Sequence, residues 1–127
     1  MNELIARISE SESVVMRAFW EAARELTISE LATALADAQH WDRSTIKTMV
    51  RRLQEKGVLI CLQRDVQYFR PAVSEDEYRA YHTRKLVSTL YHDSASKLVA
   101  SLYEQRKLTP EDIRVLRQLL DEGDQHG

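Results

Sequence analysis

Hydrophobic residues recur at helical spacing along the first half of the chain. One such stretch covers residues 10–25, a second covers residues 27–37, and a third ends at Gly57. In the third, apolar residues follow one another at intervals of three and four, as on one face of a helix; they are Ile46, Met49, Val50 and Leu53. A glycine such as Gly57 commonly ends a helix in the left-handed conformation. The pattern predicts three amphipathic helices.

Four capping boxes mark where helices begin. In each, a Ser or Thr is followed three residues later by an acid, so that the hydroxyl and the carboxylate satisfy unpaired N–H groups of the first turn. The pairs are Ser9–Glu12, Thr27–Glu30, Ser74–Glu77 and Thr109–Asp112. Pro110 also occupies the first helical position that proline favours. The four boxes predict helix starts in both halves of the chain.

After Gly57 the hydrophobic residues no longer follow the helical spacing. Two short β-rich segments, "VLICLQ" at 58–63 and "QYFRPA" at 67–72, are joined by three residues and read as a hairpin. Pro71 indicates that the second strand ends there or lies at an edge. Three helices followed by a hairpin is the order of a winged helix-turn-helix domain, expected over residues 1–73.

Residues 74–127 are expected to form a helical dimerisation domain, so that the fold class is mainly α. The periodicity predicts helices over about 75–91, 93–107 and 110–122. Their apolar stripes lack enough partner surface within one chain, and a two-fold-related copy would supply it. The alternative is that these helices fold back on the winged domain in a monomer. The stripe residues are Tyr78, Tyr81, Leu86, Leu90, Leu98, Val99, Leu102, Tyr103, Ile113, Leu116, Leu119 and Leu120.

Charge is distributed unevenly along a chain that is acidic overall. The 127 residues carry a net charge of −2, yet residues 43–70 hold seven basic and two acidic side chains, a local balance of +5. A local basic patch matters more for nucleic-acid binding than the total charge. The single cysteine, Cys61, excludes an intrachain disulfide, and no apolar run is as long as a membrane span. A cytoplasmic, soluble protein is expected.

The basic helix that precedes Gly57 combines short hydroxyls with long cations. With Ile46 at the centre of the buried face, Ser44, Thr48 and Arg51 point outward, while Thr45 and Arg52 lie on one flank and Lys47 on the other. Hydroxyls allow close approach, and Lys and Arg reach phosphates or guanine acceptors. A helix that is merely solvated would have more acidic residues between its cations, and here only Glu55 lies among them. The pattern favours a DNA-facing helix over a solvated one.

The same stretch carries a family resemblance. "WDRSTIKTMVRRLQEKG" resembles the recognition segment of the BlaI/MecI penicillinase-repressor family, which shows a Trp, a Thr-x-x-Thr spacing, an Arg-Leu pair and a Lys-Gly end in this order. The likeness extends to "SESESVVMRAFWE" upstream and to "QYFRPAVSEDEY" and "KLVASLYEQRKLTPEDIRVLRQLLDE" downstream. It therefore covers nearly the whole chain.

The resemblance implies a homodimeric repressor that binds an inverted-repeat operator on double-stranded DNA. Ser44 stands where the family commonly has a Lys, and Arg51 where it has a small polar residue, so the operator sequence is left open. The DNA contacts expected from the helix and the wing are Arg43, Ser44, Thr45, Lys47, Thr48, Arg51, Arg52, Tyr68 and Arg70. Thr45, Lys47, Thr48 and Arg52 match polar positions of the family's recognition helix, and Tyr68 matches its wing aromatic.

The resemblance also bears on the inducing signal. Copper-responsive members end in Cys-x-Cys pairs, which this chain lacks. β-Lactam-responsive members are cut by a membrane sensor protease at an Asn-Phe bond, where this chain has Ser101-Leu102. The signal, whether proteolysis or a ligand, is left open.

The sequence gives little support to a metal site, a cofactor site or an enzyme active site. The histidines His40, His82, His92 and His126 do not form a metal-binding spacing. No phosphate loop or nucleophile motif is present, so neither a cofactor nor an enzyme is expected. The competing hypothesis is a winged-helix module that binds protein rather than DNA and uses Arg51 and Arg52 on an acidic partner.

Overall fold

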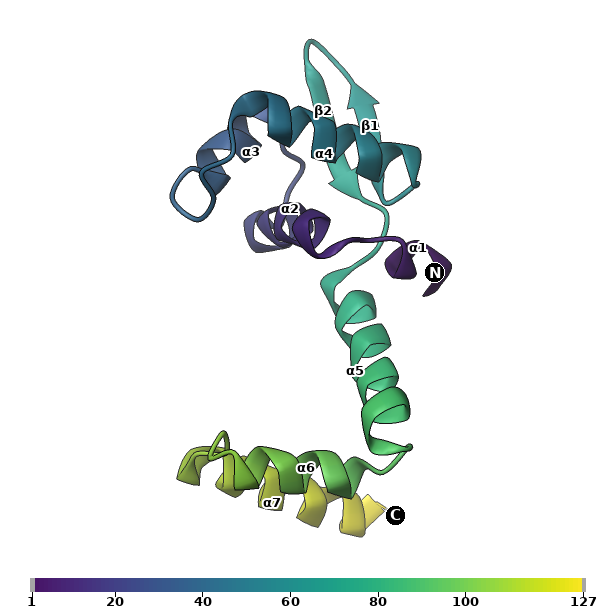
Figure 1. Cartoon of the computed structure of the whole chain (residues 1–127), viewed down its shortest axis with the longest axis vertical. Helices are drawn as coiled ribbons and strands as arrows, with labels where there is room; N and C mark the ends of the chain where they lie inside the picture. The colour runs from purple at the N-terminus through teal and green to yellow at the C-terminus, as the bar shows by residue number, and fades with distance from the viewer. Residues whose placement is uncertain (1, 127) are drawn as a thin grey trace. The chain divides into compact units, whose positions relative to one another are not determined.

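The structure, a computed structural model, describes residues 2–126 and divides them into two compact units, one ending at His82 and one beginning at Thr83. The described chain is mainly helical, and the predicted order of helices, hairpin and further helices is confirmed (Figure 1). The elements are α1 (Asn2–Ala6), α2 (Glu10–Ala22), α3 (Ile28–Leu35), α4 (Arg43–Glu55), β1 (Leu59–Gln63), β2 (Gln67–Pro71), α5 (Glu75–Tyr91), α6 (Ala95–Glu104) and α7 (Pro110–His126).

The first unit has a single hydrophobic core. Helices α2, α3 and α4 contact one another, and the hairpin packs against α2 and α4. The largest core side chains are at most 4% exposed and come from all of these elements; they include Phe19, Leu31, Ile46, Leu53, Leu59 and Phe69. The short helix α1 was not predicted, because five residues are too few to show a period. It nevertheless places Ile5 in the core.

All four capping boxes are confirmed. At the start of α2 the Ser9 hydroxyl accepts from the Glu12 N–H at 3.2 Å, and the Glu12 carboxylate accepts from the Ser9 N–H at 2.9 Å. The other three boxes make the same reciprocal pair of bonds. The predicted end of α2 at residue 25 is wrong: the helix ends at Ala22, because Ala23 takes the left-handed conformation with φ of 56°.

The wing is a two-stranded antiparallel hairpin entered through Gly57, whose φ of 83° confirms the predicted left-handed helix end. Cys61 lies opposite Phe69, and Gln63 lies opposite Gln67. Leu26, in the connector between α2 and α3, exchanges two backbone hydrogen bonds with Phe69, at 2.9 and 3.1 Å. The first unit thus ties its hairpin to the helix-turn-helix through the backbone.

Helix α5 begins within the first unit. The Trp20 indole N–H donates to the Val73 carbonyl at 3.1 Å, and its ring lies 5.1 Å from that of Tyr78. Tyr78 and Tyr81 both pack against the core. The expectation that every stripe of the second half lacks cover within the chain is therefore corrected for these two tyrosines. The domain boundary between residues 73 and 74 stays a proposal, and these contacts favour a boundary nearer His82.

The second unit contains the rest of α5 together with α6 and α7. Helix α6 begins two residues later than predicted, because His92 and Asp93 adopt positive φ and Ser94 then caps the helix. No described side chain from Thr83 to Asp124 is buried. Several large apolar side chains are mostly exposed, among them Leu90 at 64%, Tyr103 at 65% and Leu120 at 68%. This unit has apolar surface but no core of its own.

Candidate nucleic-acid interface

Helix α4 is the second helix of the helix-turn-helix, and it separates an apolar face from a polar one. Ile46, Val50 and Leu53 are buried. The side chains predicted from the sequence to contact DNA lie on the rest of its surface: Arg43, Ser44, Lys47, Arg51 and Arg52 are exposed, and Thr45 and Thr48 are half-buried. The structure thus brings all seven helical candidates together on one helix.

The N-terminal turn of α4 is built around Asp42. Its Oδ1 accepts from the Thr45 N–H at 2.8 Å and from the Ser44 hydroxyl at 2.7 Å. These bonds hold the pKa of the Asp42 carboxyl below its ordinary value, and the bond from the Thr45 N–H has the largest effect. The Thr48 hydroxyl donates to the Ser44 carbonyl at 3.0 Å. Both hydroxyl protons are therefore used within the helix, which leaves the two oxygens as acceptors toward a ligand.

Asp42 was not predicted as a cap. The capping-box pattern requires an acid three residues after the cap, and here that position is Thr45. Asp is itself a preferred N-cap residue, and this preference alone could have revealed the start of the helix.

One cation of the basic segment points into the protein. The Lys56 ammonium donates to both Glu12 carboxylate oxygens, at 2.6 and 2.9 Å, and to the Arg7 carbonyl at 3.0 Å. Burial raises the pKa of Glu12, but Lys56 and the Ser9 N–H outweigh it, so that the pKa lies below its ordinary value. Lys56 therefore joins the C-terminal end of α4 to the N-terminal end of α2 and is not part of the outward face.

The remaining cations of α4 differ in the protein groups that they bind. Arg43 donates to the Ser29 hydroxyl at the start of α3, which links the two helices of the helix-turn-helix. Among the described residues, Lys47, Arg51 and Arg52 form no ion pair with an acid. Their charges are not neutralised by the protein and are available to an anionic partner.

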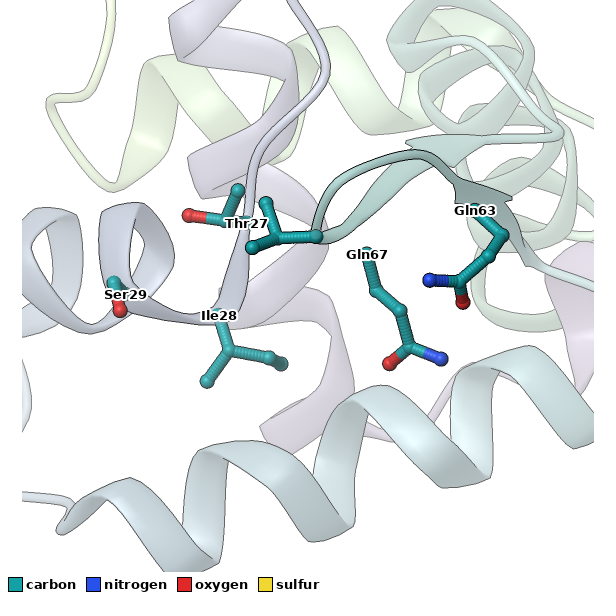
Figure 2. A pocket seen from close by; sticks show the side chains of 6 residues that line it. Thr27, Ile28, Ser29, Gln63 and Gln67 are labelled. Atoms are coloured by element: carbon teal, nitrogen blue, oxygen red, sulfur yellow. The ribbon is translucent and has the colours of Figure 1, made fainter.

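Two hollows lie next to the wing. One is lined by the start of α3 and by the hairpin, through Thr27, Ile28, Ser29, Gln63, Val66 and Gln67 (Figure 2). The neighbouring one is lined by Ile28, Lys47, Val50, Arg51, Gln54, Gln67 and Phe69. Ile28 and Gln67 line both hollows, so the two adjoin, and together they are called the wing groove; only the second hollow is lined by α4.

The sequence-predicted wing contacts do not line the wing groove. Tyr68 is half-buried, and the Arg64 guanidinium lies 5.2 Å from the centre of its ring. Arg64 also forms an ion pair with Glu25, which neutralises it. Arg70 is exposed. Sequence reasoning missed Gln54, Gln63 and Gln67 as residues of this groove. Helical spacing from Lys47 and Arg51 could have indicated Gln54, whereas the face on which Gln63 and Gln67 lie is decided only by the packing of Phe69.

Within the part of the chain that the structure describes, no group of three or more His, Cys, Asp and Glu is placed to hold a metal ion. The side chain of His126 lies outside the described residues. Of the helices described, none combines the length and the apolar character needed to cross a membrane.

Comparison with known proteins agrees with a winged-helix regulator. The family model described as penicillinase repressor matches residues 8–122, and the chain belongs to this family, which consists of transcriptional repressors rather than enzymes. The penicillinase repressor of Bacillus licheniformis is 28% identical over 119 residues, which cover 93% of this chain and 92% of the relative. The methicillin resistance regulatory protein MecI of Staphylococcus aureus strain N315 is 24% identical over 123 residues, covering 95% and 98%.

A solved structure is also similar. It is the solution structure of the Bacillus licheniformis BlaI monomer in complex with the blaP half-operator. The match has a TM-score of 0.50 and 30% sequence identity, and covers 57% of this chain and 88% of that one. The family resemblance noted in the sequence is confirmed.

Proposed function

We propose that this member of a family of DNA-binding repressors acts as a homodimer on an inverted-repeat operator, with α4 of each subunit in the major groove. The observation that carries the proposal is the outward face of α4, where Lys47, Arg51 and Arg52 are exposed and form no ion pair with any acid that the structure describes. A helix of this kind fits the major groove, and its cations reach phosphates and guanine edges. The remaining predicted contacts, Arg43, Ser44, Thr45 and Thr48, lie on the same helix.

The geometry of a dimer supports an inverted repeat. In the similar BlaI structure, one monomer is in complex with a half-operator. By analogy, one winged unit of this chain would occupy one half-site. A two-fold dimer would then require two inverted half-sites, with centres spaced by roughly 34–36 Å or a multiple of it.

The second unit supports the dimer. Its apolar side chains are half-buried or exposed although they recur at helical spacing; they include Leu86, Leu90, Leu98, Val99, Leu102, Tyr103, Ile113, Leu116, Leu119 and Leu120. Large apolar side chains that stay exposed on several helices of one unit are typical of a protein–protein interface. A second copy of the same helices is a self-complementary cover.

The DNA-binding proposal is tested by the salt dependence of binding to DNA. We expect the affinity for a duplex from the region upstream of this gene to fall steeply with salt, by about 0.9 log units per log unit of salt for each phosphate neutralised. Arg52→Ala should weaken binding and reduce the slope by about one unit if Arg52 contacts phosphate.

The matched control is Arg17→Ala, which removes an exposed cation of α2 outside the proposed interface and should leave the slope unchanged. Binding that does not respond to salt, or no binding to DNA at all, would favour the competing protein-interaction module. Footprinting should show a protected dyad, and a single asymmetric site would contradict the symmetric dimer.

Repression would follow from occlusion of the promoter, and release from any event that weakens the dimer. Two linked half-site contacts bind more tightly than one by roughly 10²–10⁴-fold. A membrane sensor protease that cuts near Ser101 is one candidate signal, and a ligand is the other. Ser101 lies inside α6, and its hydroxyl accepts from the Tyr91 hydroxyl at 3.2 Å. Proteolysis at this bond would therefore require local unfolding of α6.

A further inference from the structure

The alternation of side chains along β2 decides which face of the wing is turned toward α4. Successive residues of a strand point to opposite faces. Phe69 is 4% exposed and lines the wing groove with α4, so Gln67, two residues away, lies on the same face. Its partner Gln63 lies directly opposite it on β1. Tyr68 and Arg70 therefore lie on the other face, away from α4.

The glutamines of the groove face are oriented toward α4. Figure 2 shows the side chains of Gln67 and Gln63 next to each other, with the Gln67 amide directed into the space between the hairpin and the helix. Gln54 reaches the same groove from α4, where it follows Lys47 by seven residues and Arg51 by three and so shares their side of the helix. The groove therefore contains three neutral amides in addition to the two cations Lys47 and Arg51.

The groove has space for a ligand. Its two hollows have volumes of about 400 and 370 Å³. Both are many times larger than a single water molecule, which occupies about 30 Å³ in the liquid. A phosphate group that keeps part of its hydration can enter such a space.

The electrostatics of the groove favour an anion. Among the described residues that line the two hollows none is acidic, although the chain has 20 acidic residues. Lys47 and Arg51 supply positive charge at the α4 side, and the amides of Gln54 and Gln67 can each donate two hydrogen bonds. In the described part of the chain, those two amides make no hydrogen bond to protein, whereas the Gln63 amide donates one N–H to the Arg64 carbonyl at 3.4 Å and keeps its second N–H. They are available as donors to a backbone phosphate.

We infer that the wing contacts DNA through its inward face, with Gln67 and Gln63, and that the wing groove holds a backbone phosphate between these amides and the cations Lys47 and Arg51. This inference rests on the proposed function and replaces Tyr68 and Arg70 as the wing contacts. The Arg64 charge is neutralised by Glu25, and the Arg70 charge lies on the outward face. The wing therefore contributes neutral donors rather than charge to DNA binding.

The test changes the charge of each wing face separately and measures the salt slope of binding to a random-sequence duplex and to a duplex from the region upstream of this gene. Gln67→Lys places a cation in the groove, so affinity should rise at low salt and the slope should steepen by about 0.9. Gln67→Ala removes one net hydrogen bond, so affinity should fall by about threefold to tenfold per half-site while the slope stays the same. Arg70→Gln removes a cation of the outward face, and the slope should again stay the same.

Both positions are exposed, so the substitutions are compatible with a folded wing, and thermal unfolding checks this directly. An unchanged slope for Gln67→Lys, or a slope reduced by about one unit for Arg70→Gln, would overturn the inference. If Arg52→Ala weakens binding as proposed while Gln67→Lys has no effect, the inference alone fails. If the wild-type chain binds neither duplex, the proposed function fails with it.

Discussion

Glu12 and Lys56 are 44 positions apart in the sequence, yet their side chains form the most buried ion pair among the described residues. The Glu12 side chain is 3% exposed and that of Lys56 is 32% exposed. Glu12 also completes the capping box of α2, so one carboxylate both starts a helix and fixes the end of α4. The sequence predicts the first role from the spacing to Ser9. It cannot predict the second, because Lys56 follows a series of cations that do point outward.

Replacing Glu12 tests how much this ion pair contributes to the free energy of unfolding and how that contribution depends on pH. Glu12→Gln should lower the free energy of unfolding at pH 7 by about 1–3 kcal/mol, because the Lys56 ammonium then loses its charged partner. Since folding lowers the pKa of Glu12 below 4.5, the stabilisation is present above that pH and is lost as the pH falls through the lower, folded-state value. The difference between wild type and variant should therefore shrink in acid, as measured by urea unfolding at pH 7 and near pH 3.

Glu10→Gln is the matched control for that experiment, because Glu10 is an exposed glutamate of the same first turn. Its effect should stay within about 0.5 kcal/mol. A Glu12→Gln variant whose deficit is the same at both pH values would show that the pair does not titrate as described.

At the scale of elements, the sequence predicts where helices start better than how strands face. Capping boxes are local, and all four form as predicted. The inward face of β2 is not local: Tyr68 and Phe69 are adjacent aromatics, and the alternation alone is equally compatible with either being buried. Packing against α4 and the backbone bridge to Leu26 select Phe69. The prediction of wing contacts depended on this choice, which only the tertiary structure makes.

The link between α4 and the wing depends on Gly57. Its φ of 83° is strained for any residue with a Cβ, so Gly57→Ala should destabilise the first unit by about 1–2 kcal/mol. Gly123→Ala is the control with the opposite sign. This glycine lies inside α7, and apart from its chain neighbours and its own helical backbone no described atom lies within 4 Å of the position that an added Cβ would take, so the substitution should stabilise its helix by about 0.5–1 kcal/mol. Urea unfolding followed by circular dichroism measures both, and equal effects of the two substitutions would contradict the backbone argument.

At the scale of the molecule, the two units differ in how completely they bury their apolar residues. Among the residues that the structure describes, the first has 16 buried hydrophobic residues, all of them before Ser74, whereas the second has no buried side chain. The sequence predicts the apolar stripes of the second unit from their period. It does not separate Tyr78 and Tyr81 from the rest, because all the stripe residues share the same helical spacing. In the structure, Tyr78 differs from the other stripe residues because Trp20 of α2 packs against its ring.

The dimer predicted from these stripes can be tested without truncating the chain. Leu119 and Leu120 are 58% and 68% exposed in α7, and a second copy would bury them. The double substitution Leu119→Glu, Leu120→Glu places two like charges in each half of that interface, so light scattering should change from twice the monomer mass to the monomer mass. Affinity for a two-half-site duplex should then fall by roughly 10²–10⁴-fold, because the two contacts are no longer linked. Val66→Glu, at an apolar wing position that is 49% exposed, should keep the dimer mass. A wild-type chain that is monomeric, or a double variant that keeps the dimer mass, would refute assembly through these residues.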